Sequence, residues 1–460
     1  MGFFGREVLS TNINAVDRTN VLEVLSAVGG SYNKNKKDIR ALFDIRRGKQ
    51  EILGRPKKVR PEINNKIVIN LPHETVTFKT GFIFGEPIQY VSRGEKDRVN
   101  ASETNEAVDD IVILNRQMAR LGKYAQDLEL ADCVFACGVG YRVGEPNGKT
   151  GVFEFDTAAP DTTALVYNSG FGRRRVMSIQ ELEFEDRREL YIYTPRELIT
   201  VHTDALLQNG VVVDAQPHVL GDIPVFEYLA NTSRMGAFEL GIPILNAINL
   251  VNSNRLDGIE QFIQGFLRGI NVKIDMEKYE ELLAKGMILF ASDPGNPASL
   301  DYVTAELNQA QVQTYIDHLL EMYALVCDMP NRNAHNRSTS DTGQGVSLRD
   351  GWESAATSAK GTMALFEKPE RQFLKMYLDI NGAKNNLNID VSDIAIKFAC
   401  NTTDNILTKT QVLETLIRTG IHPQHAINTS KLFSDPNQVF IDSKPYIDAL
   451  NEAEGQTEKS

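Results

Sequence analysis

The chain has 460 residues, of which 42% are hydrophobic and 24% are charged. At about 150 residues per domain this length suggests roughly three compact units, and the apolar content argues against a disordered chain. Four cysteines are too few for a small disulfide scaffold, no run reaches about 18 apolar residues, and the first ten residues lack a signal-peptide pattern. We therefore expect a soluble chain with reduced thiols, made in a cytoplasm.

Charge is unevenly distributed along the sequence. The net charge is -12, yet residues 1–60 hold 13 basic and 6 acidic residues, so the other 400 residues carry -19. Residues 301–330 contain no Lys or Arg and five carboxylates, which are Asp301, Glu306, Asp317, Glu321 and Asp328. This overall balance is not the footprint of a protein that grips nucleic acid tightly.

The N-terminal region combines a basic helix with a helix-to-strand transition. We expect residues 18–60 to be helical, and their basic cluster fits a solvated face or flexible arm, or else an arm that faces phosphate or a partner. The cluster comprises Lys34, Lys36, Lys37, Arg40, Arg46, Arg47 and Lys49. Further along, Asn70 can cap a helix that ends at Gly85, and a strand is expected at 88–91.

The middle of the chain is rich in short strands. After a helix at 106–130, the Asn147-Gly148 pair predicts a hairpin turn. Alternating apolar patterns predict strands at 139–143, 152–155, 164–167, 175–184, 190–193, 198–202 and 211–213. This spacing predicts an antiparallel meander, so the predicted fold class is α+β and not a parallel α/β sheet.

Two helices that flank a small α/β insert follow the strands. Apolar periodicity predicts a helix over 243–270, about 40 Å long, and a second helix over 306–328. The stripe of the second helix is Val312, Tyr315, Leu319, Tyr323 and Val326. With the insert at 271–303 between them, the two helices are expected to form an antiparallel pair that carries a knob at its tip.

A polar loop and a long helix come next. Residues 329–351 are almost without apolar side chains, and a loop of this length is usually functional or disordered. A helix of about 30 residues is expected from Trp352, with the Trp side chain in the core and a kink at Pro369. A strand is expected at 394–398.

Short helices are expected in the C-terminal 55 residues. Thr408 or Thr410 is expected to cap a helix that stops at Gly420. Pro423 is expected to start the next helix, and Asp435-Pro436 a third.

No catalytic or cofactor site emerges from the sequence. The segment GEPNGKT at 144–150 has one residue too few for a phosphate-binding P-loop, and a turn is the better interpretation. Cys133 and Cys137 lack further Cys or His ligands nearby, so we expect them to act as small apolar side chains. His422 and His425 fit surface or capping roles better than a metal site. Signatures of hydrolases, metalloproteases and kinases do not occur in the sequence.

Three segments resemble one protein family. Residues 65–90, NKIVINLPHETVTFKTGFIFGEPIQY, are similar to that family's helix-to-strand signature. Residues 342–352, TGQGVSLRDGW, resemble the Gly/Ser stretch before its long helix, and residues 419–436, TGIHPQHAINTSKLFSDP, resemble its C-terminal turn and helix. The family is the portal proteins of tailed double-stranded-DNA bacteriophages, in the branch typified by long-tailed siphophages.

The resemblance implies an architecture and a function. Portal proteins form rings, usually of twelve subunits, at one capsid vertex, where they conduct double-stranded DNA during packaging and ejection and carry the packaging motor and the head-to-tail connector. The implied parts are a wing (1–239), a first stem helix (240–270), a clip (271–303), a second stem helix (304–330), a tunnel loop (331–351), a long kinked helix with a wing strand (352–405) and a crown (406–460).

The resemblance also implies partners and a location. The partners would be further copies of the chain, double-stranded DNA, the large terminase subunit, a head-completion or adaptor protein, the major capsid protein and the scaffold, with no membrane and no cofactor. The chain would act in the virion and, during assembly, in the host cytoplasm, and it would not be an enzyme.

Three groups of site residues follow from this assignment. Residues of the tunnel loop expected to face DNA are Arg332, Asn333, His335, Arg337, Gly343, Gln344, Gly345 and Arg349. Residues of an acidic stem wall, which would not hold back a sliding polyanion, are Glu306, Asp317, Glu321 and Asp328. Residues expected to dock partners on the clip are Lys273, Asp275, Glu277, Lys278 and Asp293.

Ring assembly requires two different complementary faces on each copy. Apolar residues of the two stem helices outside one stripe are expected to pack either against neighbouring copies or within the subunit. They are Leu250, Leu256, Leu267, Ile316, Leu320 and Met322.

Two other functions remain open from the residues alone. One is a packaging ATPase or nuclease subunit, which would need a P-loop or an acidic metal cluster. The other is a minor capsid or tail-adaptor protein, which would be expected to be shorter and to lack the helix–insert–helix arrangement.

Overall fold

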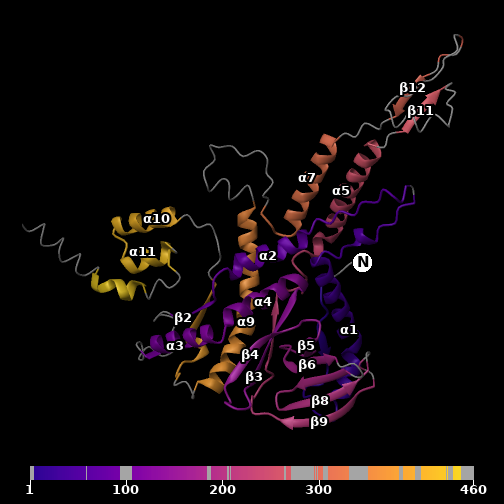
Figure 1. Cartoon of the computed structure of the whole chain (residues 1–460). Coiled ribbons are helices and arrows are strands. Elements are labelled where there is room, and N and C mark those ends of the chain that lie inside the picture. Colours follow the sequence, from indigo (N-terminus) through magenta and orange to yellow (C-terminus); the bar gives the residue numbers. More distant parts are fainter. Residues whose placement is uncertain are drawn as a thin grey trace, which may run out of the picture. The chain divides into compact units, whose positions relative to one another are not determined.

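A computed structural model of the chain divides into two compact units (Figure 1). The first unit comprises residues 1–47, 72–240 and 352–460, and the second comprises residues 48–71 and 241–351. The structure describes residues 5–58, 60–93, 106–183, 188–204, 207, 209–263, 266–270, 295, 297, 299–303, 309–330, 351–382, 387–398, 406–430, 432–433 and 439–446. Each unit is therefore built from segments that lie far apart in the sequence.

The larger sheet of the first unit has six strands in the order β1-β5-β6-β7-β8-β9. Their bounds are β1 (Leu9–Thr11), β5 (Thr163–Asn168), β6 (Arg175–Glu183), β7 (Arg188–Tyr193), β8 (Glu197–Thr203) and β9 (Val211–Pro217). From β5 to β9 each strand pairs antiparallel with the next, which confirms the predicted meander. The sequence did not predict β1, which pairs parallel with β5 and places Leu9 opposite Val166.

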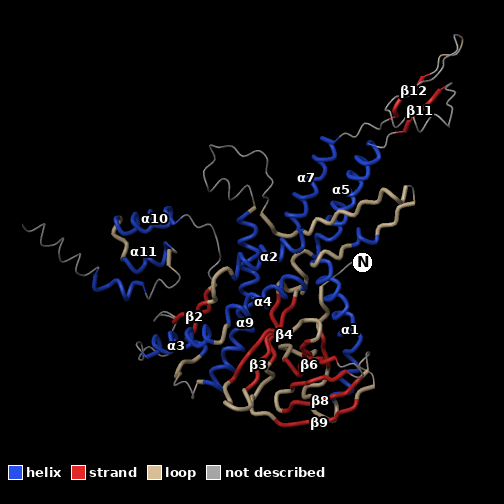
Figure 2. Tube along the Cα trace, viewed as in Figure 1, coloured by secondary structure: helices blue, strands red, loops and turns tan. Residues whose placement is uncertain are grey.

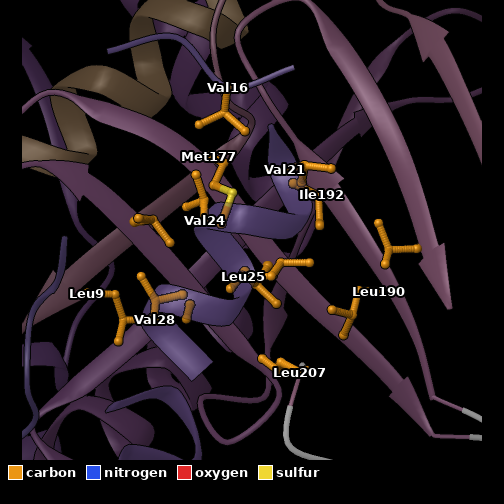
Figure 3. Close-up of a cluster of buried hydrophobic side chains, with 14 of the residues drawn as sticks. Leu9, Val16, Val21, Val24, Leu25, Val28, Met177, Leu190, Ile192 and Leu207 are labelled. Carbon is orange, nitrogen blue, oxygen red and sulfur yellow. The ribbon is translucent and has the colours of Figure 1, made fainter. Parts of the chain in front are cut away.

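Helix α1 (Val21–Arg46) packs its apolar face on this sheet (Figure 3). Val21, Val24, Leu25 and Val28 follow the i, i+3, i+4, i+7 spacing of one helical face. They lie in one buried cluster with sheet residues that include Met177, Leu190 and Ile192. The helix is therefore part of the core.

The basic cluster of α1 is largely paired within the unit, so its interpretation as a flexible arm is wrong. Lys36 is buried, and its Nζ lies 2.8 Å from both carboxylate oxygens of Glu181 on β6. Arg40 contacts Asp161 at 2.8 Å, and Arg46 pairs with Asp132. A charge pattern read along the chain could not reveal these carboxylates, because they lie more than 80 residues away.

The predicted extension of this helix to residue 60 is also wrong. Helix α1 ends at Arg46, and Gly48 has a φ of +92°, which only glycine adopts readily. A short 3-10 turn, Glu51–Gly54, follows in the second unit.

A second sheet of the first unit has the order β10-β3-β4. Its strands are β10 (Val225–Leu229), β3 (Val139–Pro146) and β4 (Phe153–Ala158). The predicted hairpin joins β3 to β4, and within its loop the side-chain oxygen of Asn147 accepts a hydrogen bond from the backbone N–H of Lys149 at 3.0 Å. The GEPNGKT segment is therefore a turn, as its residue spacing indicated.

Helices α4 (Lys123–Cys137) and α9 (Trp352–Asn381) pack on this second sheet. Helix α9 continues through Pro369 and buries Phe366, Phe373 and Tyr377, as its predicted stripe required. Trp352 is half-buried, and its ring centroid lies 5.9 Å from that of Phe78. The kink at Pro369 stays a prediction.

The helix-to-strand signature forms α2 (Leu71–Phe84) followed by β2 (Gln89–Ser92). Strand β2 pairs antiparallel with the predicted C-terminal strand, β13 (Ile394–Lys397). Helix α3 (Glu106–Arg120) contacts β2 through Asn115, whose side-chain amide donates to the backbone oxygen of Tyr90 at 2.8 Å.

Four charged side chains are buried together where α4, β3 and α9 meet. The guanidinium of Arg142 donates to Glu370 Oε2 at 2.8 Å and also pairs with Asp127. The ammonium of Lys123 lies 2.7 Å from Asp127 and 2.9 Å from Glu370. Two positive and two negative charges therefore balance in a site that excludes water.

Two tyrosines complete this cluster. Tyr90 on β2 and Tyr228 on β10 donate their hydroxyls to Glu370 at 2.5 and 2.7 Å. Burial raises the pKa of Glu370, but Lys123 and Arg142 outweigh burial, and the net effect lowers the pKa below its ordinary value of 4.5. The carboxylate thus stabilises the fold above pH 4.5, and this contribution is lost as the pH falls through the lowered pKa.

Glu370→Ala should destabilise the first unit by about 3–5 kcal/mol, because it leaves buried positive charge without its partner. The measurement is the free energy of unfolding in urea, followed by far-UV circular dichroism. Glu367→Ala on the same helix breaks a partly exposed pair with Arg371 and should cost less than about 1 kcal/mol. Equal losses in the free energy of unfolding for the two variants would contradict the stabilising role of the buried charge balance.

The second unit contains α5 (Ile242–Ile263), β11 (Phe266–Ile270), β12 (Ser299–Val303) and α7 (Gln309–Val326) (Figure 2). The prediction of one helix over 243–270 is wrong at its end, because β11 pairs antiparallel with β12. The partner strand lies about 30 residues further along the chain, so helical spacing alone could not reveal it. The remainder of the expected insert, 271–294, lies outside the described residues.

The C-terminal region contains α10 (Ile406–Arg418) and α11 (Pro423–Ser430). Helix α10 begins at Ile406, so the predicted cap at Thr408 or Thr410 is wrong, whereas Gly420 follows its end with a φ of +84°. Residues 439–446 are helical, and the expected start of this helix at Pro436 lies outside the described residues. None of the described helices combines the length and apolar character needed to cross a membrane.

Candidate functional site

Helices α5 and α7 of the second unit lie side by side and run antiparallel (Figure 1). A Cβ added at Gly241, just before α5, would lie 2.7 Å from Tyr323 near the end of α7. Towards the other end of the pair, Arg255 donates to Gln309 at 2.6 Å and to Gln313 at 2.7 Å. These contacts confirm the antiparallel pair that the sequence predicted.

An extended segment, residues 64–70, lies along a stripe of polar side chains on α5. The backbone N–H groups of residues 65, 67 and 69 donate to side chains of α5. The three bonds are Ile69 to Asn249 Oδ1 at 2.9 Å, Ile67 to Ser253 Oγ at 3.0 Å and Asn65 to Asp257 Oδ1 at 2.8 Å. We call residues 48–71 the strap.

The spacing of these bonds follows from the two backbone geometries. Two residues of extended chain advance about 6.6 Å, and four residues of helix advance about 6 Å. Every second N–H of the strap therefore meets every fourth side chain of α5, approximately in step. Asn249, Ser253 and Asp257 are all buried, and through these bonds they satisfy a segment that has no sheet neighbour of its own.

Asp257 is the charged end of this arrangement. Its Oδ2 lies 2.8 Å from Lys57 Nζ and 3.3 Å from Arg55. Burial raises the pKa of Asp257, but hydrogen bonds from Lys57 and Asn65 outweigh burial and lower the pKa below 3.8. The carboxylate is therefore ionised at neutral pH, and its two oxygens bind the strap at Asn65 and at Lys57.

Asp257→Ala should release the strap, because it removes the acceptor of Asn65 and the counter-charge of Lys57. Between residues 55 and 66 trypsin can cleave after Lys57, Lys58 and Lys66, whereas Arg55 and Arg60 precede proline and are resistant, so limited trypsin digestion reports opening of the strap. We expect cleavage there to accelerate by about tenfold or more, which corresponds to roughly 1.4 kcal/mol. Glu260→Ala, one turn along α5, is the matched control and should leave the rate unchanged.

Helix α7 has three different faces. At about 100° per residue, the face towards α5 carries the buried Ile316 and Tyr323, which corrects part of the predicted stripe. Tyr315 is 52% exposed and Val326 is 40% exposed. They project within about 20° of each other, and together with the half-buried Leu319 they form a second apolar stripe that borders the helix interface.

The third face of α7 is acidic. Asp317 and Glu321 lie one turn apart on α7, and Asp328 lies two residues beyond its end. Asp317 is half-buried and accepts a hydrogen bond from Gln313 at 2.8 Å, whereas Glu321 and Asp328 are exposed. The structure thus places two of the four predicted acidic residues on one side of α7 and a third just beyond its end, and Glu306 lies outside the described residues.

The other predicted site residues cannot be placed. The tunnel-loop residues Arg332, Asn333, His335, Arg337, Gly343, Gln344, Gly345 and Arg349 lie outside the described residues. The clip residues Lys273, Asp275, Glu277, Lys278 and Asp293 also lie outside them.

The expected neighbour-facing residues divide into different groups. Ile316 is only 4% exposed and packs within the unit, which is the second of the two expected arrangements. Leu250 is 43% exposed, whereas Leu256, Leu320 and Met322 are half-buried. The side chain of Leu267 lies outside the described part of the chain.

The cysteine and histidine pairs do not form a metal site. Cys137 is fully buried, and burial raises the pKa of its thiol to about 12, consistent with an apolar role. His422 and His425 are exposed, and His422 accepts a backbone hydrogen bond from Gln424 at 3.3 Å. Among the residues that the structure describes, no three His, Cys, Asp or Glu side chains are placed to hold a metal ion.

Sequence reasoning missed the strap. A signal was present in α5, where Asn246, Asn249, Ser253 and Asp257 interrupt an apolar helix at the spacing of one face. Polar residues on one face of a helix are normally solvated, so this pattern by itself does not identify a buried partner.

Comparison with known proteins connects this sequence to a family. A sequence model of the family described as "Phage portal protein, SPP1 Gp6-like" matches residues 30–444, about 90% of the chain. A solved structure of the "Neck of empty GTA particle computed with C6 symmetry" contains a similar chain, with a TM-score of 0.46 and 11% sequence identity. That similarity covers 79% of this chain and 90% of the other. No curated protein sequence matches the chain.

Proposed function

The chain belongs to the SPP1 Gp6-like family of phage portal proteins, structural components of the virion that form a ring at a capsid vertex for DNA passage, and from this premise we propose which parts of it carry out each task. The α5–α7 pair is the stem and stands beside its copies around the channel. The observation that supports this most directly is that α7 offers an acidic face and a separate apolar stripe beyond its contact with α5.

The acidic face of α7 lines the channel. Double-stranded DNA carries one negative charge per about 1.7 Å, and cationic groups that replace its counterions hold it in place. A wall that carries Asp317, Glu321 and Asp328 gives the duplex no such contacts, so the DNA slides. Residues 301–330 contain no Lys or Arg that would counteract this effect.

Asp317→Lys combined with Glu321→Lys should slow DNA packaging or trap DNA in the channel, because the new cations bind phosphate. The measurement is the amount of nuclease-protected DNA per particle over time, and added salt should partly restore the rate. Gln311→Lys with His318→Lys adds cations to another exposed part of α7 and is the control. Unchanged packaging in the acidic-face variant would argue against this role.

The apolar stripe of α7 packs against the next copy. A closed ring uses a heterologous contact, in which one face of each subunit meets a different face of its neighbour. Tyr315 and Val326 are the exposed anchors of this stripe, and Leu250 on α5 is an exposed apolar residue that the contact would cover.

Tyr315→Asp with Val326→Asp should prevent ring formation, because it places two charges in an apolar contact. Mass photometry should then show single subunits, whereas the unaltered chain should give a ring of about twelve subunits. The thermal unfolding of the subunit should not change, because both side chains are exposed. Leu325→Asp lies about 100° from Val326 on α7 and should assemble normally.

The remaining parts have the tasks that the family resemblance implies. Residues 1–239 and 352–405 form the wing, residues 271–303 the clip, residues 331–351 the tunnel loop that faces DNA, and residues 406–460 the crown. The clip receives the large terminase subunit during packaging and a head-completion or adaptor protein afterwards. The major capsid protein and the scaffold meet the ring in the capsid.

The alternative functions have less support. A minor capsid or tail-adaptor protein is disfavoured because the portal family matches nearly the whole chain. A packaging ATPase or nuclease is disfavoured for the same reason, and the closest approach to a P-loop is the β3–β4 turn.

A further inference from the structure

The turn between β5 and β6 exposes an aromatic side chain at its tip. Phe171 has a relative exposure of 107%, the highest among the large apolar side chains of the described residues. Arg173 and Arg174 follow it and are also exposed. Aromatic residues and arginine are enriched in protein interfaces, where they act as anchors.

This tip is rigid in spite of its exposure. The backbone N–H of Gly170 donates to Asn168 Oδ1 at 2.6 Å, and the backbone N–H of Asn168 donates to the oxygen of Arg174 at 2.8 Å. A Cβ at Gly170 would lie 2.6 Å from Asn168 Oδ1, so a larger residue would displace this side chain, and Gly172 has a φ of +85°, which favours glycine. Arg173 has a φ of +41°, a conformation that costs a non-glycine residue free energy.

The base of the tip is also fixed. Arg175, at the start of β6, pairs with Asp222 at 2.5 Å, and its guanidinium lies 5.3 Å from the ring centroid of Phe226. An exposed aromatic ring on a preorganised turn loses little conformational freedom on binding, which favours tight contact with a partner.

A groove of about 550 Å³ lies elsewhere on the same unit. This volume falls within the range of about 300–1,000 Å³ that is typical of binding pockets, so the groove can receive an aromatic side chain. Its lining includes the apolar groups of Phe43, Ala159 and Pro160 and the carboxylates of Glu129 and Asp161. Over its whole lining, three carboxylates outnumber two arginines.

The tip and the groove lie at opposite ends of β5. The strand begins at Thr163, two residues after the groove residue Asp161, and ends at Asn168, directly before the tip. Six residues of strand span about 20 Å. A subunit with complementary features at opposite ends can bind the next copy head to tail, which is the arrangement that a closed ring requires.

We infer that the tip around Phe171 of one copy inserts into this groove of the neighbouring copy, with Phe171 on the apolar lining and Arg173 and Arg174 beside the carboxylates. This inference rests on the proposed ring. It adds a second contact between neighbours, made by the first unit and separate from the helix pair of the second unit.

Double-stranded DNA suits the tip less well than protein does. Its phosphates would pair with Arg173 and Arg174, but a paired duplex offers no apolar pocket for a Phe ring, which would need unpaired bases on which to stack.

Cysteine cross-linking tests the contact directly. Phe171→Cys and Ala159→Cys are combined in a Cys133→Ala background, and the assembled material is oxidised. Within one copy the two cysteines lie beyond opposite ends of β5, a strand about 20 Å long, whereas a disulfide allows only roughly 7 Å between Cα atoms. We therefore expect a ladder of covalent oligomers on a non-reducing gel, up to the full ring.

In a matched control, the first cysteine is placed at another exposed apolar position and Phe171 is left unchanged. Val211 is 65% exposed and lies on β9, four strands from β5 in the same sheet. Val211→Cys with Ala159→Cys should give no ladder. Rings without a ladder in the Phe171 variant, or equal ladders in both, would overturn the inference while leaving the proposed ring intact. If the unaltered chain forms no ring, the proposed function fails and this contact fails with it.

Charge reversal provides a second test that does not depend on oxidation. Arg173→Glu with Arg174→Glu should raise the protein concentration needed for half-maximal ring formation by about tenfold, measured by mass photometry. Adding Glu129→Arg to the same chain should restore assembly, because the charges are exchanged across the contact. Failure of this exchange to restore assembly, in a chain that still folds, would contradict the pairing.

Discussion

The fold of the first unit depends on the balance of buried charge around Arg142. Arg142 and Lys123 neutralise Asp127 and Glu370 in a region from which water is excluded. A buried charge without its partner is strongly unfavourable, so the loss of α4, β3 or α9 from the packed unit would leave buried charge unbalanced. Tyr90 and Tyr228 extend this dependence to β2 and β10. A portal subunit that must withstand DNA passage gains cooperativity from such an arrangement.

The second unit uses polar groups for another purpose. Buried polar side chains of α5 accept hydrogen bonds from the strap, which covers one side of this helix. Helix α7 covers a different side of α5. The acidic face and the exposed apolar stripe of α7 are then left for contacts outside the subunit. The proposed channel wall and the proposed contact with the next copy both rest on this division.

Regular periodicity explains which elements could be predicted. The meander from β5 to β9, the β3–β4 turn and the buried stripe of α9 follow from patterns that repeat every two or every 3.6 residues. Strand β11 was missed because its apolar residues also fit a helix, and β1 because three residues carry too little pattern. The acidic face of α7 was predicted from composition, but of its predicted apolar stripe only Tyr323 is buried whereas Tyr315 and Val326 are exposed, since spacing does not tell which apolar residues of a helix are covered.

The sequence alone determined the fold class, the paired helices, the acidic segment and, through its motifs, membership in the portal family. Those properties depend on local spacing, on turn residues and on composition, which are readable along the chain. The tertiary structure alone decided which charges are neutralised, where the strap lies and which apolar side chains stay exposed. These properties depend on partners such as Glu370 for Arg142 or Asp257 for Lys57, about 200 residues apart, which meet only when the chain has folded.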